Sequence, residues 1–127
     1  MNPVELKYDK EHEWVRVEGD IAVIGISDFA QDQLGEVVYI DLPSAGDSVT
    51  AGETFGEIES VKSVSELYAP VTGEIVKVND ALSDTPETVN QDPYGEGWMI
   101  EVRMDDPSQP DGLMSAEEYE AYVAEGA

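Results

Sequence analysis

The chain contains 127 residues, with 29 acidic against 6 basic side chains and a formal net charge of -23 at pH 7. This length supports one domain with a modest core, and the 41% apolar content is too high for a wholly disordered chain. The charge repels phosphates and anionic lipids, so we expect neither nucleic acid nor membrane partners. The absence of cysteine excludes disulfides, thiolate metal sites and cysteine nucleophiles.

The N-terminal segment has no apolar signal core, and no apolar run reaches transmembrane length, so we expect a soluble, cytoplasmic protein. The acids are scattered along the chain, and there are only four lysines. This composition resembles that of cytosolic proteins from extreme halophiles, including haloarchaea. At 1 M salt the Debye length falls to about 3 Å, which screens self-repulsion. We interpret the acidity as salt adaptation; a specific acidic docking face is an alternative that it does not exclude.

The first part of the chain predicts a β-hairpin and a short helix. Residues 13–19 and 21–27 are rich in β-branched residues, and Gly19 with Asp20 marks the turn between them. Ser27 is placed to cap a helix over residues 28–34, which Gly35 would end.

The middle and the end of the chain predict further strands and one terminal helix. We expect a buried strand over residues 36–42, further strands at 54–61, 64–70, 73–78 and 98–104, one short helical turn within 79–97, a loop at 106–112 and a helix at 115–125. The apolar face of the terminal helix is thin, so we expect its acidic side to be solvated. No segment is long enough to act as a linker, so we predict a single domain over residues 1–127. Many short strands with Gly and Pro turns favour a sandwich or a barrel.

Lys62 stands where the strands at 54–61 and 64–70 would reverse direction. Taken alone, a lysine at such a turn is most simply a solvated surface residue. The link, however, contains no Gly, Asn or Pro, so a hairpin here must be held by the rest of the protein. Its amine would then project from a rigid tip, a placement suited to modification by another protein.

Residues 45–79 resemble the lipoyl-attachment signature. The matching features are Gly46-Asp47, Glu59 three residues before Lys62, Ala69-Pro70 and Gly73-Glu74. We expect Gly46 and Gly73 to occupy turns with positive φ that fix the flanking strands. Biotin carriers usually flank their lysine with methionines, whereas Val61 and Ser63 stand here, which favours lipoate.

The resemblance extends from about Tyr8 to Val123 and is to the H-protein family of the glycine cleavage system. Beyond the lysine, it is carried by EHEWVRVEGDIAVIGISDFAQDQLGEVVYIDLP, DPYGEGWMIEV and LMSAEEYEAYV. It implies a mainly β fold, a barrel-sandwich hybrid with short helices including one at the C-terminus. The lipoyl-binding core would cover about residues 18–103. Such proteins are carriers rather than enzymes.

The resemblance also implies a cofactor, partners and site residues. Lipoate would be joined to Lys62 by a lipoate ligase or lipoyl transferase. Glycine decarboxylase (P protein) would load an aminomethyl group, aminomethyltransferase (T protein) would remove it, and dihydrolipoamide dehydrogenase (L protein) would reoxidise the dithiol. Glu13 and Glu66 match positions that contact the aminomethyl group, although either could instead be a solvated carboxylate. Glu59, Gly46 and Gly73 would serve hairpin presentation and recognition.

Several other residues take simpler interpretations. His12, flanked by acids and without a second histidine, is a poor metal ligand and a doubtful catalytic base, so we assign it a structural or incidental role. Gln33 stands where some family members have a histidine, so titration at that position is not essential. We expect Trp14, Tyr39 and Trp98 to be core residues rather than ligand-stacking ones.

Three alternatives stay open at this point. The chain could be a lipoyl domain of a 2-oxoacid dehydrogenase, but that role predicts a hinge linker and a catalytic domain, and the chain has neither. It could also be a lipoyl donor for such complexes, a role that would use the same Lys62. An enzyme using His12 with Glu11 or Glu13 would instead show a perturbed histidine in a pocket. A binding module would leave Lys62 exposed and never modified.

Overall fold

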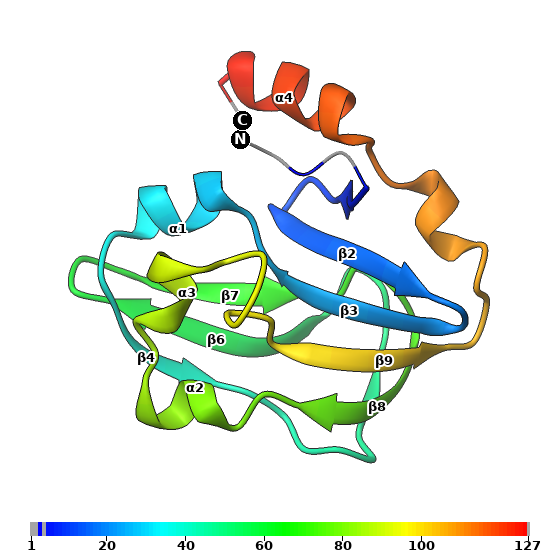
Figure 1. The fold of residues 1–127 in the computed structure, drawn as a ribbon, viewed down its shortest axis with the longest axis horizontal. Coiled ribbons are helices and arrows are strands. Elements are labelled where there is room, and N and C mark those ends of the chain that lie inside the picture. The colour runs from blue at the N-terminus through cyan, green and yellow to red at the C-terminus, as the bar shows by residue number, and fades with distance from the viewer. Residues whose placement is uncertain (1–2, 4, 127) are drawn as a thin grey trace.

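The computed structural model describes residues 3 and 5–126 and contains two antiparallel sheets (Figure 1). The six-stranded sheet has the order β1-β2-β3-β9-β8-β5, and the three-stranded sheet has the order β4-β6-β7. The strands are β1 (Lys7–Tyr8), β2 (Glu13–Glu18), β3 (Ile21–Ile26), β4 (Val37–Asp41), β5 (Ser48–Val49), β6 (Thr54–Ser60), β7 (Val64–Tyr68), β8 (Gly73–Val78) and β9 (Ile100–Met104). The mainly β architecture that the sequence predicts is confirmed.

Four α-helices and one 3-10 helix connect or flank these strands. They are α1 (Asp28–Leu34), α2 (Ala81–Asp84), α3 (Thr88–Gln91), η1 (Gln109–Gly112) and α4 (Ala116–Ala124). Ser27 accepts a hydrogen bond from the Ala30 amide at the start of α1, as predicted. Ser115 and Glu118 form a capping box at the start of α4, which fixes the predicted terminal helix. Among the described residues, no helix is long and apolar enough to cross a membrane.

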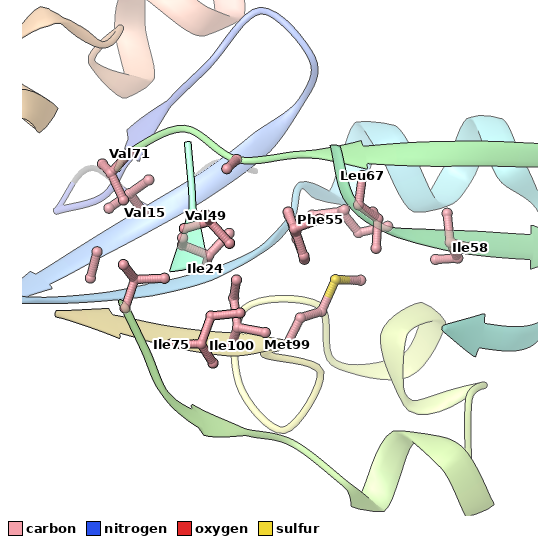
Figure 2. Close-up of a cluster of buried hydrophobic side chains, with 14 of the residues drawn as sticks. Val15, Ile24, Val49, Phe55, Ile58, Leu67, Val71, Ile75, Met99 and Ile100 are labelled. Carbon is pink, nitrogen blue, oxygen red and sulfur yellow. The ribbon is translucent and has the colours of Figure 1, made fainter. Parts of the chain in front are cut away.

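The main core lies between the two sheets, where inward-facing side chains interdigitate (Figure 2). Val15 and Ile24 reach it from the six-stranded sheet, and Ile58 and Leu67 reach it from the three-stranded sheet. Figure 2 also shows Met99 directed into this cluster. Burial of such side chains is the main favourable contribution to folding.

A second cluster covers the opposite face of β2 and β3. There Trp14 and Val23 are buried with Tyr8, and Tyr119 of α4 stacks on the Tyr8 ring at 4.7 Å between centroids. Because both faces of β3 are covered, its sequence is almost continuously apolar instead of alternating. Gly25 is needed here, since a Cβ at this position would lie 2.7 Å from the Trp14 indole.

Three expectations for individual segments are wrong. In β4 only Val37 and Ile40 are buried, and Tyr39 is 55% exposed, because a bulge follows Val37 and no described element covers the outer face of the three-stranded sheet. Residues 79–97 contain two short helices, α2 and α3, rather than one helical turn. Residues 106–112, expected to form a loop, include the 3-10 helix η1, which has Pro110 in its first turn.

The two signature glycines meet different requirements. Gly46 has φ of 98° and occupies the expected left-handed turn. Gly73 does not have positive φ; it lies inside β8, paired with Met104 of β9 and Val49 of β5. A Cβ at Gly73 would collide with the Arg103 carbonyl oxygen, so this position requires glycine for close strand approach.

Candidate functional site

The turn that carries Lys62 is organised by the side chain of Ser60. Ser60 Oγ accepts hydrogen bonds from the backbone amides of Lys62 (3.2 Å) and Ser63 (3.1 Å), and the Ser60 amide donates to the Ser63 carbonyl (2.8 Å). Ser60 is only 6% exposed. None of the residues 60–63 has positive φ, so the turn does not need the Gly or Asn that primed hairpin turns require, and the Ser60 hydroxyl satisfies its backbone amides.

The hairpin is also attached to the segment that follows α1. The Val61 amide donates to the Glu36 carbonyl at 3.0 Å. Asn90 of α3 holds that segment from the other side: its side-chain oxygen accepts from the Val37 amide (2.9 Å), and its side-chain nitrogen donates to the Gly35 carbonyl (2.8 Å). The prediction that the protein must hold this hairpin in place is therefore confirmed.

Lys62 is exposed at the tip of this hairpin, which lies beside α1 in Figure 1. A Cβ built on Gly35 would lie 3.4 Å from Lys62 Cε, so the lysine stem crosses close to the end of α1. Its amine forms no hydrogen bond or ion pair with any described residue. The nitrogen is free for chemical modification.

A groove of about 360 Å³ lies between α1, β7 and the turn before β2. Its apolar part includes Phe29 and Leu34 of α1, and its polar part includes Glu13 and Glu66. Gln33, which stands where some family members have a histidine, also lines it. The structure therefore brings the predicted residues Glu13 and Glu66 together at one groove near the lysine hairpin.

Glu13 is not a solvated carboxylate: it is 1% exposed. Its Oε2 accepts a hydrogen bond from the Tyr68 amide at 3.1 Å, whereas Oε1 has no donor among the described residues. Burial raises the pKa of Glu13 well above its usual range, and the neighbouring Asp9 carboxyl group raises it further. Glu13 is thus a buried carboxyl group that lacks a partner for one oxygen.

Asp9 was not identified from the sequence, although it organises the turn that holds Glu13. Its Oδ1 accepts from the backbone amides of Glu11 (3.0 Å) and Glu13 (2.9 Å). Burial raises the pKa of Asp9, and these hydrogen bonds oppose that shift. An Asp followed by a polar turn and a strand is a signal for an Asx turn, so turn chemistry could have identified the residue.

Glu66 and Glu59 lie on the exposed side of the three-stranded sheet. Glu66 pairs in register with Glu57, and its Oε2 accepts from the Tyr68 hydroxyl at 3.1 Å. Glu59 pairs with Val64 and with Tyr39. Both acids are exposed, so Glu66 reaches the groove from its rim, whereas Glu13 reaches it from a buried position.

His12 joins the groove to the C-terminal helix. Its Nδ1 lies 2.7 Å from the Tyr119 hydroxyl, which is itself 2.7 Å from Ser27 Oγ. Burial lowers the pKa of His12, which favours the neutral ring. Its φ of 73° is strained for a non-glycine residue. These contacts are consistent with the structural role expected for His12. The contacts of Tyr119 with His12 and Ser27 could not be predicted, because only the tertiary fold joins these distant segments.

The aromatic residues differ in their positions. Trp14 is fully buried and its indole nitrogen donates to the Pro93 carbonyl at 2.9 Å, as expected for a core residue. Trp98 is partly buried against the second cluster, with Lys77 Nζ 5.6 Å from its ring centre. Tyr39, expected in the core, is exposed beside the hairpin strands.

Comparisons with known proteins assign the chain to a family. A family model described as "Glycine cleavage H-protein" matches residues 6–126. The glycine cleavage system H protein of Myxococcus xanthus is 58% identical over 121 residues, covering 95% of this chain and 94% of the relative. That of Geobacillus kaustophilus is 57% identical over 124 residues, covering 98% of each.

A solved structure gives the same assignment. The crystal structure of a glycine cleavage system H protein from Mycobacterium marinum superimposes with a TM-score of 0.89 at 39% identity, covering 97% of this chain and 99% of that one. The fold of two facing sheets and the family match together place the chain among carrier proteins. The chain belongs to the glycine cleavage H-protein family, whose members are carrier subunits.

Proposed function

We propose that this chain is the lipoyl-carrying H protein of a glycine cleavage system, with lipoate joined by an amide bond to Lys62. The observation that carries the proposal is the exposed, unpaired Lys62 amine on a hairpin fixed by Ser60 and Glu36, next to a groove lined by Glu13. The residues present fit the group, because a free amine is available for acylation and the nearby groove offers both apolar and acidic surfaces.

The bound lipoate would supply the dithiolane, which accepts the aminomethyl cargo and carries electrons. The chain would present this group to partners, shelter it and orient it. Phe29 and Leu34 provide apolar surface for the arm. Glu13 and Glu66 would hold the cationic amine of the cargo through charge-assisted hydrogen bonds, which are about twice as strong as neutral ones. Water has little access to Glu13, which strengthens its electrostatic contact.

The partners follow from the carrier role. The P protein would load the cargo, the T protein would unload it and the L protein would reoxidise the dithiol, after a lipoate ligase or lipoyl transferase has modified Lys62. Each must reach the β6–β7 hairpin, and Glu59 is exposed on it for recognition. Gly46 and Gly73 would act only indirectly, because the turn before β5 and the start of β8 belong to the six-stranded sheet and not to the hairpin. The domain would comprise residues 1–127.

Intact mass with peptide mapping, on protein purified from its native source, tests the modification. A lipoyl-sized addition on Lys62 is expected, and reconstitution with P, T and L proteins should then support glycine cleavage. The Lys62→Gln variant should fold normally, carry no lipoyl group and support no glycine cleavage. An unmodified Lys62 in cells that lipoylate other proteins would overturn the proposal. Transfer of lipoate from this chain to a 2-oxoacid dehydrogenase would instead identify a lipoyl donor.

A further inference from the structure

The environment of Glu13 is unfavourable to an ionised carboxylate when no cargo is bound. The side chain is 1% exposed and receives one hydrogen bond, from the Tyr68 amide. Its Oε1 is buried without a donor among the described residues. A buried carboxylate with an unsatisfied oxygen carries a large desolvation cost, which it avoids by taking up a proton.

Asp9 provides an acceptor for that proton. Its carboxylate is fixed by the amides of Glu11 and Glu13, and the Asp9 amide in turn donates to the Glu13 carbonyl at 3.0 Å. Asp9 Oδ1 is held 2.9 Å from the Glu13 amide, so the Asp9 carboxyl group lies beside Glu13 and its charge raises the Glu13 pKa. Two neighbouring carboxyl groups that are shielded from water repel each other when both are ionised, which favours one proton between them. Asp9 already has two backbone donors and so suits the charged form, whereas Glu13 suits the protonated form.

The other groups around Glu13 supply no compensating positive charge. Glu11 comes from the same turn, and Glu66 and Tyr68 come from β7; none of these is cationic. His12 is adjacent and favours its neutral ring, and the face of α1 that lines the groove carries no ionisable side chain. Among the described residues that line the groove, there is no lysine or arginine.

We propose that Asp9 and Glu13 share one proton in the unloaded carrier, and that a protonated primary amine entering the groove displaces this proton to solvent. The inference rests on the proposed function, since the amine is that of the cargo. The O–H bond of Glu13 breaks, its proton leaves to bulk water, and the carboxylate accepts an N–H of the ammonium. Oε1 thereby gains the donor that it lacks. No oxidation or reduction takes place.

This exchange makes cargo capture dependent on pH. Binding of the ammonium releases a proton, so its affinity rises with pH as long as the amine stays protonated. Asp9 is a positioning residue in this scheme: it never touches the cargo, but it keeps Glu13 protonated until a cation arrives. When the cargo leaves, Glu13 takes a proton from water and returns to its pairing with Asp9.

Carboxyl-carbon NMR titration of the full, unlipoylated chain tests the shared proton directly. In the wild-type protein Glu13 should titrate at clearly higher pH than the exposed glutamates. Asp9→Asn keeps the oxygen that accepts from the two backbone amides but removes the charge, so the Glu13 titration should move to lower pH. Glu11→Gln is the matched control on the same turn and should move it less, because the charge of Glu11 raises the Glu13 pKa less than Asp9 does.

Melting curves of both variants establish that they are folded, and a structural role for Asp9 alone would not shift the Glu13 titration. The proposal of a shared proton would be overturned if Glu13 titrated together with the exposed glutamates. It would also be overturned if Asp9→Asn left the Glu13 titration unchanged. Because this measurement uses unlipoylated protein, it is independent of whether Lys62 is ever modified. Failure of lipoylation would remove the proposed function and leave the carboxyl-pair result intact.

Methylammonium chloride is the probe for displacement. At a pH where Glu13 is protonated, the probe should move the Glu13 carboxyl signal toward its ionised position, and an equal concentration of KCl should not. A pH-stat should record proton release that Glu13→Gln abolishes. Equal responses to methylammonium and KCl would overturn displacement by an amine.

Discussion

At the scale of the residue, Glu13 illustrates how a site can oppose stability. The pKa of Glu13 is higher in the folded than in the unfolded chain, so the folded protein binds an extra proton between the two values. The stability that Glu13 contributes is fully present below its pKa in the unfolded chain, near the ordinary 4.5. It is lost as the pH rises through its pKa in the folded chain. The protein therefore keeps a functional carboxyl at a position that favours a neutral group.

Replacing Glu13 with Gln should stabilise the protein at neutral pH. The amide cannot ionise, its oxygen can accept from the Tyr68 amide, and its nitrogen can donate to Asp9. We expect a gain of about 1 kcal/mol at pH 7, comparable to relief of one buried unsatisfied group, and little gain near pH 4. Thermal melts at both pH values in constant salt measure this. A loss of stability at pH 7 would show that ionised Glu13 is stabilised by the fold.

The Tyr119 hydroxyl should matter for stability more than other tyrosine hydroxyls. Tyr119→Phe leaves buried Ser27 and partly buried His12 without their shared partner, which should cost about 1–3 kcal/mol. Tyr122→Phe on the same helix is the control: its hydroxyl donates to the exposed Lys10 carbonyl at 3.2 Å, and its loss should cost less than about 0.5 kcal/mol. Urea unfolding compares the two; equal costs would contradict the hydroxyl–imidazole contact.

At the scale of the element, the β6–β7 hairpin depends on structure outside itself. Ser60 forms the turn, Glu36 accepts from the Val61 amide, and Asn90 fixes the segment that contains Glu36. A two-stranded hairpin is at best marginally stable alone. Its rigidity therefore depends on a residue from α3 that is nearly thirty positions away in the chain.

Asn90→Ala should loosen the lysine hairpin without touching it. The variant removes the acceptor for the Val37 amide and the donor to the Gly35 carbonyl and the Gln31 side-chain oxygen. It should lower the free energy of unfolding by about 1–3 kcal/mol. Hydrogen exchange at the Val61 amide should accelerate together with this loss. Gln91→Ala, an exposed neighbour on α3, is the control and should change neither quantity. Unchanged protection of Val61 in Asn90→Ala would show that the hairpin holds itself.

At the scale of the whole molecule, the charge is nearly uncompensated. The ion pairs recorded among the described residues are Arg16 with Glu18 (2.8 Å) and Arg103 with Glu74 (2.9 Å), both exposed to solvent. Exposed pairs of this kind contribute roughly 0–1 kcal/mol each. Against a net charge of -23, self-repulsion therefore dominates the long-range electrostatics of the surface.

We propose that the folded state is adapted to high salt. The melting temperature should rise steeply as KCl increases toward about 1 M, where the Debye length is about 3 Å. The effect should shrink near pH 4, because many carboxylates are then protonated. Circular dichroism that is unchanged down to millimolar salt would contradict salt adaptation, and the acidity would then be better explained by a docking face.

The sequence alone determined much of the local structure and the chemistry at one lysine. Alternating and continuous apolar runs located the longer strands of both sheets but not the two-residue strands β1 and β5. Ser27 and Ser115 located the starts of two helices, because caps are local properties. The motif around Lys62 identified its hairpin and the family. Glu13 and Glu66 were carried over from the resemblance, and the structure places both at one groove.

Only the tertiary structure decided which side chains are buried and which groups meet. Tyr39 is aromatic and was expected inside, but no segment that the structure describes covers its face of the sheet. Gly73 matched a motif, yet its role is strand approach rather than a turn. Asp9 beside Glu13, and Tyr119 beside His12, depend on contacts between segments that local patterns cannot pair. Burial is a property of the packed molecule, and it is burial that converts Glu13 from one acid among 29 into a distinct chemical group.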